Sequence, residues 1–383
     1  MPGHKQRSLW ASERATLLAE SQYGALASTA GMQRDAIVGC ILGIAVGDAI
    51  GLPYEGMNPR RASRVFKELG RHHFVFGRGM VSDDTEHTCL VAEAILEARG
   101  NHKVFAQRLA CSLRWWLLGI PAGVGLATLR ACLRLWMGVP PDNSGVFSAG
   151  NGPAMRSALL GVVYGDNPTV LRTMVGISTR ITHVDPKALS GALTVAIAAH
   201  QSSSGVSITP YDFGELIRVR LDDSDTGEFL QLVDGACLSA ARGEPLDKFA
   251  ESIGCGKGIS GYMLHTVPCV IQTWLRHQTA YRAGVEEMLA AGGDTDTTAA
   301  ILGGITGAGV GKNGIPSEWL SGIVEWPRRT TWMEALGDAV VRSLAGDAAV
   351  RVPPLFVPGV PVRNAFFMAV VLAHGLRRLV PPY

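Results

Sequence analysis

The chain is dominated by long segments in which apolar residues recur three and four positions apart. These segments are residues 37–50, 85–98, 103–118, 154–164, 168–178, 187–199, 214–219, 229–241, 261–276, 281–291 and 297–309. Such spacing places apolar side chains on one face of a helix. No stretch shows a convincing series of the alternating apolar and polar residues that half-buried strands require. The pattern therefore predicts an all-α protein, a compact bundle of helices.

Glycines occur both within the first helical segment and in clusters between segments. Gly39, Gly43 and Gly47 stand at every fourth position of the first segment, so they share one face and would let another helix backbone approach closely. Glycine, proline and serine also cluster at residues 119–125, 138–152 and 202–210. These clusters predict loops within one domain, which we place at residues 34–383, after an N-terminal extension of residues 1–33.

Composition narrows the class of protein. The 383 residues are 47% hydrophobic and 18% charged, which is enough to bury a large core. The formal net charge is +2, and no helical face carries a run of Lys and Arg. We therefore expect a small-molecule or protein substrate and no nucleic acid as the main partner.

The cysteines and the two ends of the sequence bear on the cellular compartment in which the protein is expected. The seven cysteines are odd in number, lie mostly in apolar helical segments and form no Cys-x-x-Cys pair, so they read as reduced core residues. The first residues lead into no apolar signal core, and the apolar run at residues 365–376 is only about 12 residues long, too short for a bilayer. We predict a cytoplasmic protein, outside the membrane and monomeric. His72 and His73 lack metal-ligand spacing and are interpreted as surface residues.

Two acidic motifs each open an apolar helical segment. One is Ser82-Asp83-Asp84-Thr85, and the other is Asp294-Thr295-Asp296-Thr297. A single Asp or Ser at such a position is an ordinary N-cap, which is the simpler interpretation. Paired carboxylates repel each other unless a cation compensates, and oxygen ligands suit Mg²⁺, Mn²⁺ or Ca²⁺ better than Zn²⁺. We interpret the two motifs as halves of one metal site.

Five motifs in this order resemble those of the ADP-ribosylglycohydrolases of the dinitrogenase-reductase-activating type. They lie at residues 39–55, 82–85, 150–156, 182–183 and 292–297, and the resemblance covers roughly residues 36–325. Ser82 stands where the family usually has Thr, which keeps the oxygen and removes a methyl group.

The resemblance implies a fold, a metal centre and a reaction. The fold would be the family's multi-helix bundle with roughly orthogonal helices. Two Mg²⁺ ions, or Mn²⁺ in their place, would be held by Ser82, Asp83, Asp84, Asp294, Asp296 and Thr297, with Asp294 bridging. The reaction would be hydrolysis of the bond between ADP-ribose and a protein side chain, through an oxocarbenium-like transition state. Arginine is the expected leaving group, although relatives that act on serine or on free ADP-ribose derivatives share the same motifs.

The resemblance also implies roles around the metals. Glu55 or Asp84 would transfer the proton, and the sequence does not choose between them. The residues that would contact the substrate are Gly123, Gly125, Ser148, Gly150, Asn151, Gly152, His183 and Tyr262. Glycine-rich loops can present backbone N–H groups to phosphates. The simpler interpretations are a helix break for the first loop, a capping or core histidine for His183, and packing for Tyr262.

Other functions stay open at this stage. A binding protein for ADP-ribose or for a toxin would keep the fold without turnover, and a prenyl diphosphate synthase would also bring two acidic helix motifs to a diphosphate. The synthase motif is normally Asp-Asp-x-x-Asp, which this chain lacks at residues 83–87. The extension of residues 1–33 is a packing helix or a partner-binding arm, which could cover an ADP-ribosylating toxin if the protein confers immunity.

Overall fold

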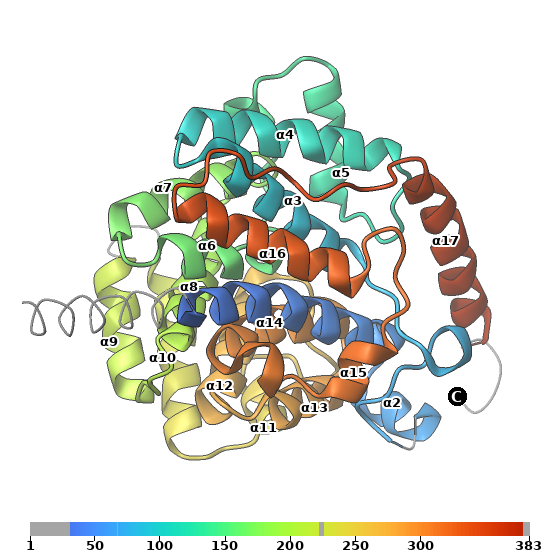
Figure 1. Ribbon diagram of the computed structural model, residues 1–383. Helices are drawn as coiled ribbons and strands as arrows, with labels where there is room; N and C mark the ends of the chain where they lie inside the picture. The colour runs from blue at the N-terminus through green and yellow to red at the C-terminus, as the bar shows by residue number, and fades with distance from the viewer. Residues whose placement is uncertain (1–30, 67, 222–225, 378–383) are drawn as a thin grey trace, which may run out of the picture.

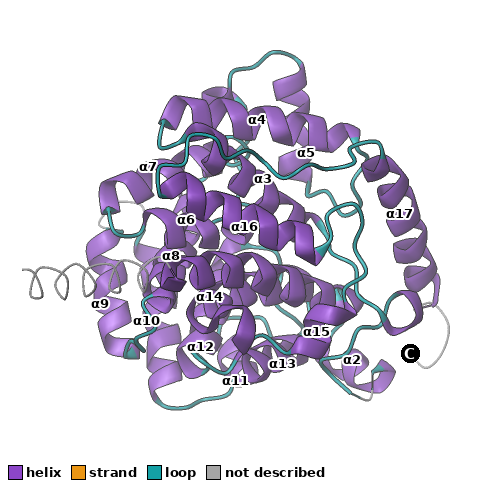
Figure 2. Cartoon of the chain, in the orientation of Figure 1, coloured by secondary structure: helices purple, strands orange, loops and turns teal. Residues whose placement is uncertain are grey.

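The computed structural model describes residues 31–66, 68–221 and 226–377. Within these ranges the chain forms helices and isolated backbone bridges without a β-strand, which confirms the all-α prediction (Figure 1; Figure 2). Residues 31–51 form the first described helix. The further elements are η1 (Leu52–Tyr54), α2 (Pro59–Val65), η2 (Val75–Gly77), α3 (Asp83–Ala98), α4 (His102–Leu118), α5 (Leu126–Trp136), η3 (Pro141–Asn143), η4 (Ala154–Arg156), α6 (Ala158–Tyr164), α7 (Pro168–Arg180), α8 (Pro186–Ser203), α9 (Pro210–Arg220), α10 (Gly227–Ala241), α11 (Leu246–Ser252), α12 (Met263–Arg276), α13 (Tyr281–Ala291), α14 (Thr295–Gly314), α15 (Ser317–Gly322), α16 (Thr330–Leu344) and α17 (Gly359–Arg377).

The centre of the molecule is the helix of residues 31–51 packed antiparallel against α14. A Cβ atom built on Gly43 would lie 2.2 Å from the carbonyl oxygen of Gly303, and one on Gly47 would lie 2.1 Å from that of Ala299. Gly39 and Gly51 are as close to Gly307 and Thr295, respectively. Only glycine allows two backbones to approach this closely. The predicted glycine face is confirmed, and it brings the end of the first helix to the start of α14.

Other helices surround this pair. α8, α12 and α13 pack against α14, while α16 and α4 pack against α3 (Figure 1). α14 has no exposed face over its first 14 residues, because every residue from Thr295 to Ala308 is buried. The amino ends of α3 and α14 therefore lie inside the molecule, and most residues of their acidic motifs are buried.

The sequence pattern missed several elements. It predicted no helix for α5 or α16, although both are amphipathic, and it did not identify the short helices α2, α11 and α15. Residues 1–30 of the predicted extension lie outside the described part of the chain, and residues 31–33 belong to the first helix. All seven cysteines are free, and six of them are buried.

The C-terminal helix corrects a prediction about length. The apolar run expected to be too short for a bilayer belongs to α17, which has 19 residues because it also includes Gly359 to Asn364 and Arg377. Among the described residues, α17 and the helix from Gly31 to Tyr54 are long and apolar enough to cross a membrane. The most apolar 18-residue window of the helix from Gly31 to Tyr54 is entirely buried in the core, whereas only 22% of the corresponding window in α17 is buried. α17 keeps an exposed apolar face that includes Val362, Phe366 and Leu372.

A second correction concerns the adjacent histidines. His72 is 8% exposed, and its Nε2 lies 2.7 Å from the carbonyl oxygen of Trp319. The ring of His73 packs on Phe66 with 4.3 Å between ring centroids. The prediction that both are surface residues was wrong, because α15 covers His72 and no local pattern indicates that contact.

Candidate active site

The two acidic motifs meet at the buried amino ends of α3 and α14. Ser82 is the N-cap of α3, and its hydroxyl lies 3.1 Å from Oδ2 of Asp84. The hydroxyl of Thr297, more than two hundred residues later, donates to the same oxygen at 3.3 Å. The structure therefore brings together the two halves that the sequence placed in one site.

These motifs border a cavity of about 590 Å³. The predicted residues on its wall are Glu55, Asp83, Gly123, Gly125, Ser148, Gly150, Asn151, Gly152, His183, Asp294, Asp296 and Thr297. Ser82 and Asp84 are not on the wall; Asp84 contacts it through Thr297, and Ser82 contacts Asp84. Tyr262 is also absent from the wall, and its hydroxyl accepts a hydrogen bond from Nζ of Lys187 at 3.0 Å. Lys257 and Ser260 line the cavity and were not identified from the sequence.

The carboxylates of the two acidic motifs lie close enough together to disfavour one another's ionisation. Burial, and then the charges of Asp83 and Asp48, raise the pKa of Asp84 well above its ordinary value. Burial and the charge of Glu55 do the same to the pKa of Asp296. Burial also raises the pKa of Asp294. A bound cation would relieve both the repulsion and the cost of burial.

The donor set fits Mg²⁺ or Mn²⁺. Oδ1 of Asp84 and Oδ1 of Asp296 are buried without a hydrogen-bond partner, which leaves two carboxylate oxygens free to ligate. No group of three or more His, Cys, Asp or Glu side chains in the described part of the chain is already arranged to hold a metal ion. The argument for Mg²⁺ or Mn²⁺ therefore rests on the oxygen ligands of the two motifs and on the two carboxylate oxygens without a hydrogen-bond partner.

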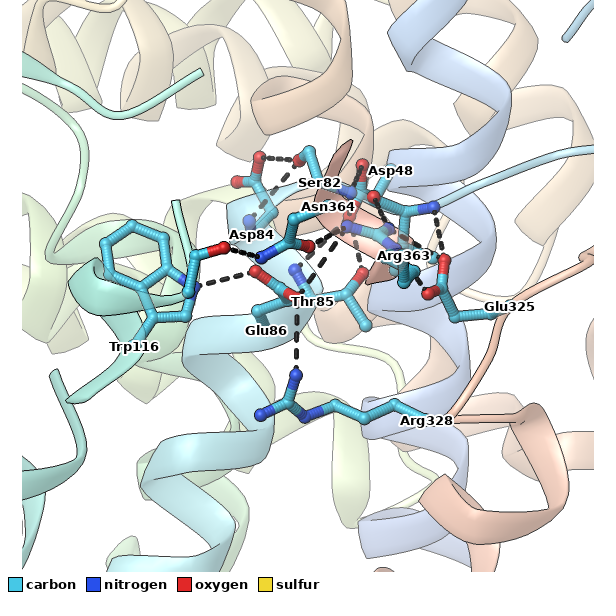
Figure 3. Close-up of polar contacts among 12 residues, drawn as sticks. Asp48, Ser82, Asp84, Thr85, Glu86, Trp116, Glu325, Arg328, Arg363 and Asn364 are labelled. Carbon is cyan, nitrogen blue, oxygen red and sulfur yellow. Dashed lines mark hydrogen bonds and ion pairs between the residues drawn. The ribbon is translucent and has the colours of Figure 1, made fainter. Parts of the chain in front are cut away.

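Asp48 positions the first acidic motif, a role that the sequence did not reveal. Its carboxylate accepts the backbone N–H of Ser82 at 2.8 Å and the hydroxyl of Thr85 at 2.5 Å, and it is fully buried (Figure 3). Burial raises the pKa of Asp48 to about 6, although these hydrogen bonds oppose the shift. The first helix thus caps α3 through a side chain that lies 34 residues upstream of Ser82.

The second acidic motif is held by its backbone. Gly293 forms bridges with Met57 on one side and Ile259 on the other, and the N–H of Asp294 donates to the carbonyl of Ile259 at 2.7 Å. Gly293 has a φ of +87°, and a Cβ there would lie 2.0 Å from that carbonyl oxygen. Glycine is therefore required at this position, and the bridges fix where Asp294 starts α14.

The glycine-rich loop contacts the second motif directly. Nδ2 of Asn151 donates to Oδ2 of Asp294 at 2.6 Å and to the hydroxyl of Thr266 at 3.0 Å. The backbone of Gly150 forms a bridge with Tyr262. Asn151 thus orients a predicted metal ligand, and Tyr262 supports the loop from outside the cavity.

His183 lies against this loop in its neutral form. Burial and then the charge of Arg156 lower the pKa of His183 to about 3. Its Nδ1 lies 2.8 Å from the hydroxyl of Thr182, and its Nε2 edge faces Gly150. Arg156, which sequence analysis did not single out, is fully buried and donates to the carbonyl of Gly152 at 3.1 Å. The histidine and the loop therefore share one buried support.

The structure distinguishes the two proton-transfer candidates by position. Glu55 follows η1 and lies on the cavity wall, with an exposed side chain. Asp84 is 1% exposed and lies behind the wall. A group that exchanges protons with a substrate must reach it directly or through one water. This geometry favours Glu55.

Comparison with known proteins identifies the family of the chain. The profile of the ADP-ribosylglycohydrolase family matches residues 29–349. The chain belongs to the ADP-ribosylglycohydrolase family. An uncharacterised protein of Archaeoglobus fulgidus is 31% identical over 74% of this chain and 90% of its own length. The ADP-ribosyl-[dinitrogen reductase] glycohydrolase of Rhodospirillum rubrum is 26% identical over 75% of this chain and 90% of its own.

A solved structure confirms the family's bundle as the fold. A chain of an ADP-ribosylglycohydrolase-related protein complex matches with a TM-score of 0.55 and 25% identity, over 82% of this chain and 99% of its own length. Membership of this family of hydrolases excludes the prenyl diphosphate synthase alternative. Residues 350–383 lie beyond the part of the chain that the family profile matches.

Proposed function

We propose that this protein is a Mg²⁺-dependent hydrolase that releases ADP-ribose from modified protein side chains, with ADP-ribosylarginine as its preferred substrate. One observation carries the proposal. Residues of both acidic motifs, Glu55 and two glycine-rich loops line a single cavity, which would bring metal ligands, a proton-transfer group and phosphate-binding backbone together in one place. Membership of the ADP-ribosylglycohydrolase family supports the same reaction.

The metal ligands would be the oxygens of the two motifs. Ser82, Asp83 and Asp84 would contribute from α3, and Asp294, Asp296 and Thr297 from α14. When bound, Mg²⁺ or Mn²⁺ would supply charge stabilisation and would orient the vicinal ribose hydroxyls and a water. The residues around the motifs have a separate task, because Asp48 and Asn151 hold the ligands in place.

The loops at residues 123–125 and 148–152 would bind the diphosphate. Both line the cavity, and glycines at these positions leave backbone N–H groups accessible to phosphate oxygens. His183 is neutral near pH 7, so it would donate or accept a single hydrogen bond without adding charge. Lys257 is the one Lys or Arg among the residues that line this cavity, and it would add a positive charge at the rim.

Glu55 would hold the proton that the reaction moves. As the bond between the anomeric carbon and the guanidine nitrogen breaks, the nitrogen would keep the electron pair and take a proton from the carboxyl group; the water that then bonds to the anomeric carbon would return a proton to the carboxylate. A carboxyl group on the cavity wall can serve both steps in turn. Asp84 would act as a metal ligand only, because it lies behind the wall.

The test is release of ADP-ribose from arginine-modified and serine-modified proteins, with Mg²⁺ and with a chelator. We expect release from arginine that requires Mg²⁺ and is lost in Asp294→Ala and Asp296→Ala. Preferential release from serine would keep the reaction and change the linkage. Tight binding of ADP-ribose without release from either protein would identify a binding protein instead.

Immunity against an ADP-ribosylating toxin is a further part of the proposal. The family profile begins at residue 29, so most of the extension of residues 1–33 precedes it. We expect this extension to bind the toxin in the cytoplasm. Deletion of residues 1–33 should then weaken toxin binding by an Asp296→Ala variant while ADP-ribose release by the unsubstituted core persists. Unchanged toxin binding would contradict a role for the extension.

A further inference from the structure

Behind the first acidic motif lies a buried network of charges drawn from distant segments. Glu86 comes from α3, Glu325 and Arg328 from the loop before α16, and Arg363 from α17 (Figure 3). The side chains of Arg363, Glu325 and Glu86 are 5%, 3% and 5% exposed. Buried charges are rare unless they are paired, so each member needs the others. The network is outside the cavity and has no part in the proposed reaction.

Arg363 and Glu325 together hold one backbone unit. Nε and Nη2 of Arg363 donate to the two carboxylate oxygens of Glu325 at 2.6 and 2.8 Å. Nη2 of Arg363 also donates to the carbonyl of Val81 at 2.5 Å, and Oε2 of Glu325 accepts the N–H of Val81 at 3.3 Å. Both polar groups of Val81 are therefore bound by this ion pair.

Val81 directly precedes the predicted ligands. Its carbonyl carbon is bonded to the nitrogen of Ser82, whose N–H is accepted by Asp48. Four positions further on, Glu86 accepts a hydrogen bond from Nε1 of Trp116 at 2.7 Å, and Nη1 of Arg363 lies 3.8 Å from it. The segment that carries Ser82, Asp83 and Asp84 is thus held at both ends.

We propose that Arg363 is a positioning residue for the metal-binding segment at residues 82–84, so that α17 completes the site although it lies beyond the matched part of the family. The inference rests on the proposed function for its metal. Nη1 of Arg363 also donates to Oδ1 of Asn364, and the guanidinium lies over the ring of Phe367. α17 has further anchors that do not involve the guanidinium, because Phe367 packs with Leu52, Phe74 and Met80 and Asn364 donates to the carbonyl of Gly119. The loss of one guanidinium therefore removes the contact with Val81 while these anchors remain.

The guanidinium is suited to this task by its shape. Its planar fork binds both oxygens of Glu325 and still reaches the carbonyl of Val81, whereas the single ammonium of lysine cannot reproduce three fixed directions. Removal of the positive charge alone would strengthen the attraction of the remaining carboxylates for a cation. Displacement of residues 82–84 would weaken Mg²⁺ binding, whereas removal of the Arg363 charge would strengthen it. The direction of the change in Mg²⁺ affinity therefore shows which effect dominates.

The experiment uses the full chain with Arg363→Met and Arg363→Lys. The matched control is Arg276→Met, which breaks a partly buried ion pair with Glu287 on α12 and α13, away from the cavity wall. Mg²⁺ affinity is measured by calorimetry, backbone hydrogen exchange is measured over residues 80–86 in metal-free protein, and folding is checked by circular dichroism. ADP-ribose release is followed as a function of Mg²⁺ concentration.

We expect Arg363→Met to weaken Mg²⁺ binding about tenfold, at the lower end of the effect of outer-shell partners, and to speed exchange over residues 80–86. Arg363→Lys should show a smaller loss, and Arg276→Met should bind Mg²⁺ like the unsubstituted chain. Release by Arg363→Met should recover at high Mg²⁺. Unchanged or tighter binding, or an equal loss in Arg276→Met, would overturn the inference.

Failure of the proposed function would look different. If the unsubstituted chain binds Mg²⁺ but releases no ADP-ribose, the proposed reaction is wrong while the effect of Arg363 on affinity and exchange still decides the inference. If Arg363→Met does not fold, Mg²⁺ affinity and hydrogen exchange are compared between Arg363→Lys and the unsubstituted chain. A chain that binds no Mg²⁺ overturns both.

Discussion

Asn151 is the side chain that couples the glycine-rich loop to the second acidic motif. Its amide donates to Asp294 and to Thr266, so the carboxylate is held in one orientation. We expect Asn151→Ala to lower ADP-ribose release and Mg²⁺ affinity by roughly 10–100-fold, the usual effect of losing a hydrogen bond to a metal ligand. Calorimetry with Mg²⁺ and steady-state assays measure this effect.

The control for this prediction is Asn143→Ala. Asn143 is exposed at the end of η3 and is not among the residues that line the cavity. It should change neither quantity. An equally small effect of Asn151→Ala would show that Asp294 keeps its orientation without the amide.

The role of a single residue in the site can be predicted from its neighbours in the sequence in some cases and not in others. Ser82, Asp83, Asp294 and Asp296 can be predicted from the local motif, since adjacent or alternating acids at a helix start are unusual. Asp48 and Arg156 could not be found in this way. Each looks like an ordinary polar residue in its own segment, and its role comes from partners far along the chain.

At the scale of elements, the contact between the first helix and α14 depends on glycine. We expect Gly43→Ala to lower the free energy of unfolding by at least about 2 kcal/mol, because its Cβ would meet the rigid carbonyl of Gly303. Urea denaturation measures the change. Since these helices carry Glu55 and Asp294 to the cavity, Mg²⁺ affinity should fall in the same variant.

Gly375→Ala provides the comparison. Gly375 lies in α17 with nothing within 4 Å of the added Cβ. There alanine should stabilise the protein by about 0.5–1 kcal/mol, through its higher helix propensity and the reduced freedom of the unfolded chain. Equal destabilisation by both substitutions would contradict the role given to the close approach.

The junction of α12 and α13 should make stability depend on pH. Burial opposes ionisation of Glu287, but hydrogen bonds from His277, the N–H of Leu246 and Arg276 lower its pKa to about 2. A depressed carboxyl pKa stabilises the fold above the unfolded value and loses that stabilisation as the pH falls towards the folded value. Between pH 5.5 and pH 3 we expect a loss of about 2 kcal/mol from this group.

Glu287→Gln isolates this contribution. Urea denaturation at the two pH values should show a smaller pH dependence in the variant, by about 2 kcal/mol, together with lower stability near pH 7 because the charged pair is lost. An unchanged pH dependence would mean that other carboxylates account for the acid sensitivity.

For the whole molecule, the buried carboxylates link metal binding to stability. Mg²⁺ at about 100 times its dissociation constant should stabilise the fold by about 2.7 kcal/mol, which corresponds to a rise of about 3–5 °C in melting temperature. The rise should be larger at pH 8 than at pH 6. The raised pKa values of Asp83, Asp84 and Asp296 mean that protons compete with the metal as the pH falls.

Asp296→Asn tests this link by scanning calorimetry. The variant should lose the Mg²⁺-induced rise, while its metal-free melting temperature should equal or exceed that of the unsubstituted chain because one buried, repelled carboxylate is gone. A chelator should lower the melting temperature of the metal-loaded unsubstituted chain only. A full Mg²⁺ response in the variant would exclude Asp296 as a ligand.

The sequence by itself determined the features that a few neighbouring residues encode. Periodic apolar residues specified helices, and glycine at every fourth position specified a close helix contact. Paired acids at helix starts predicted oxygen ligands for a metal ion. These features depend on local geometry, which is the same wherever the segment lies. The motifs also follow one another along the chain in the same order as in the family that they resemble.

Only the tertiary structure decided which distant groups share one environment. It placed Asp48 beneath Ser82, Arg363 beside Val81 and His72 under α15, and it moved Asp84 and Tyr262 off the cavity wall. The reason is physical. Burial and pairing of a polar side chain depend on what packs over it, and that packing is a property of the assembled helices rather than of any one segment.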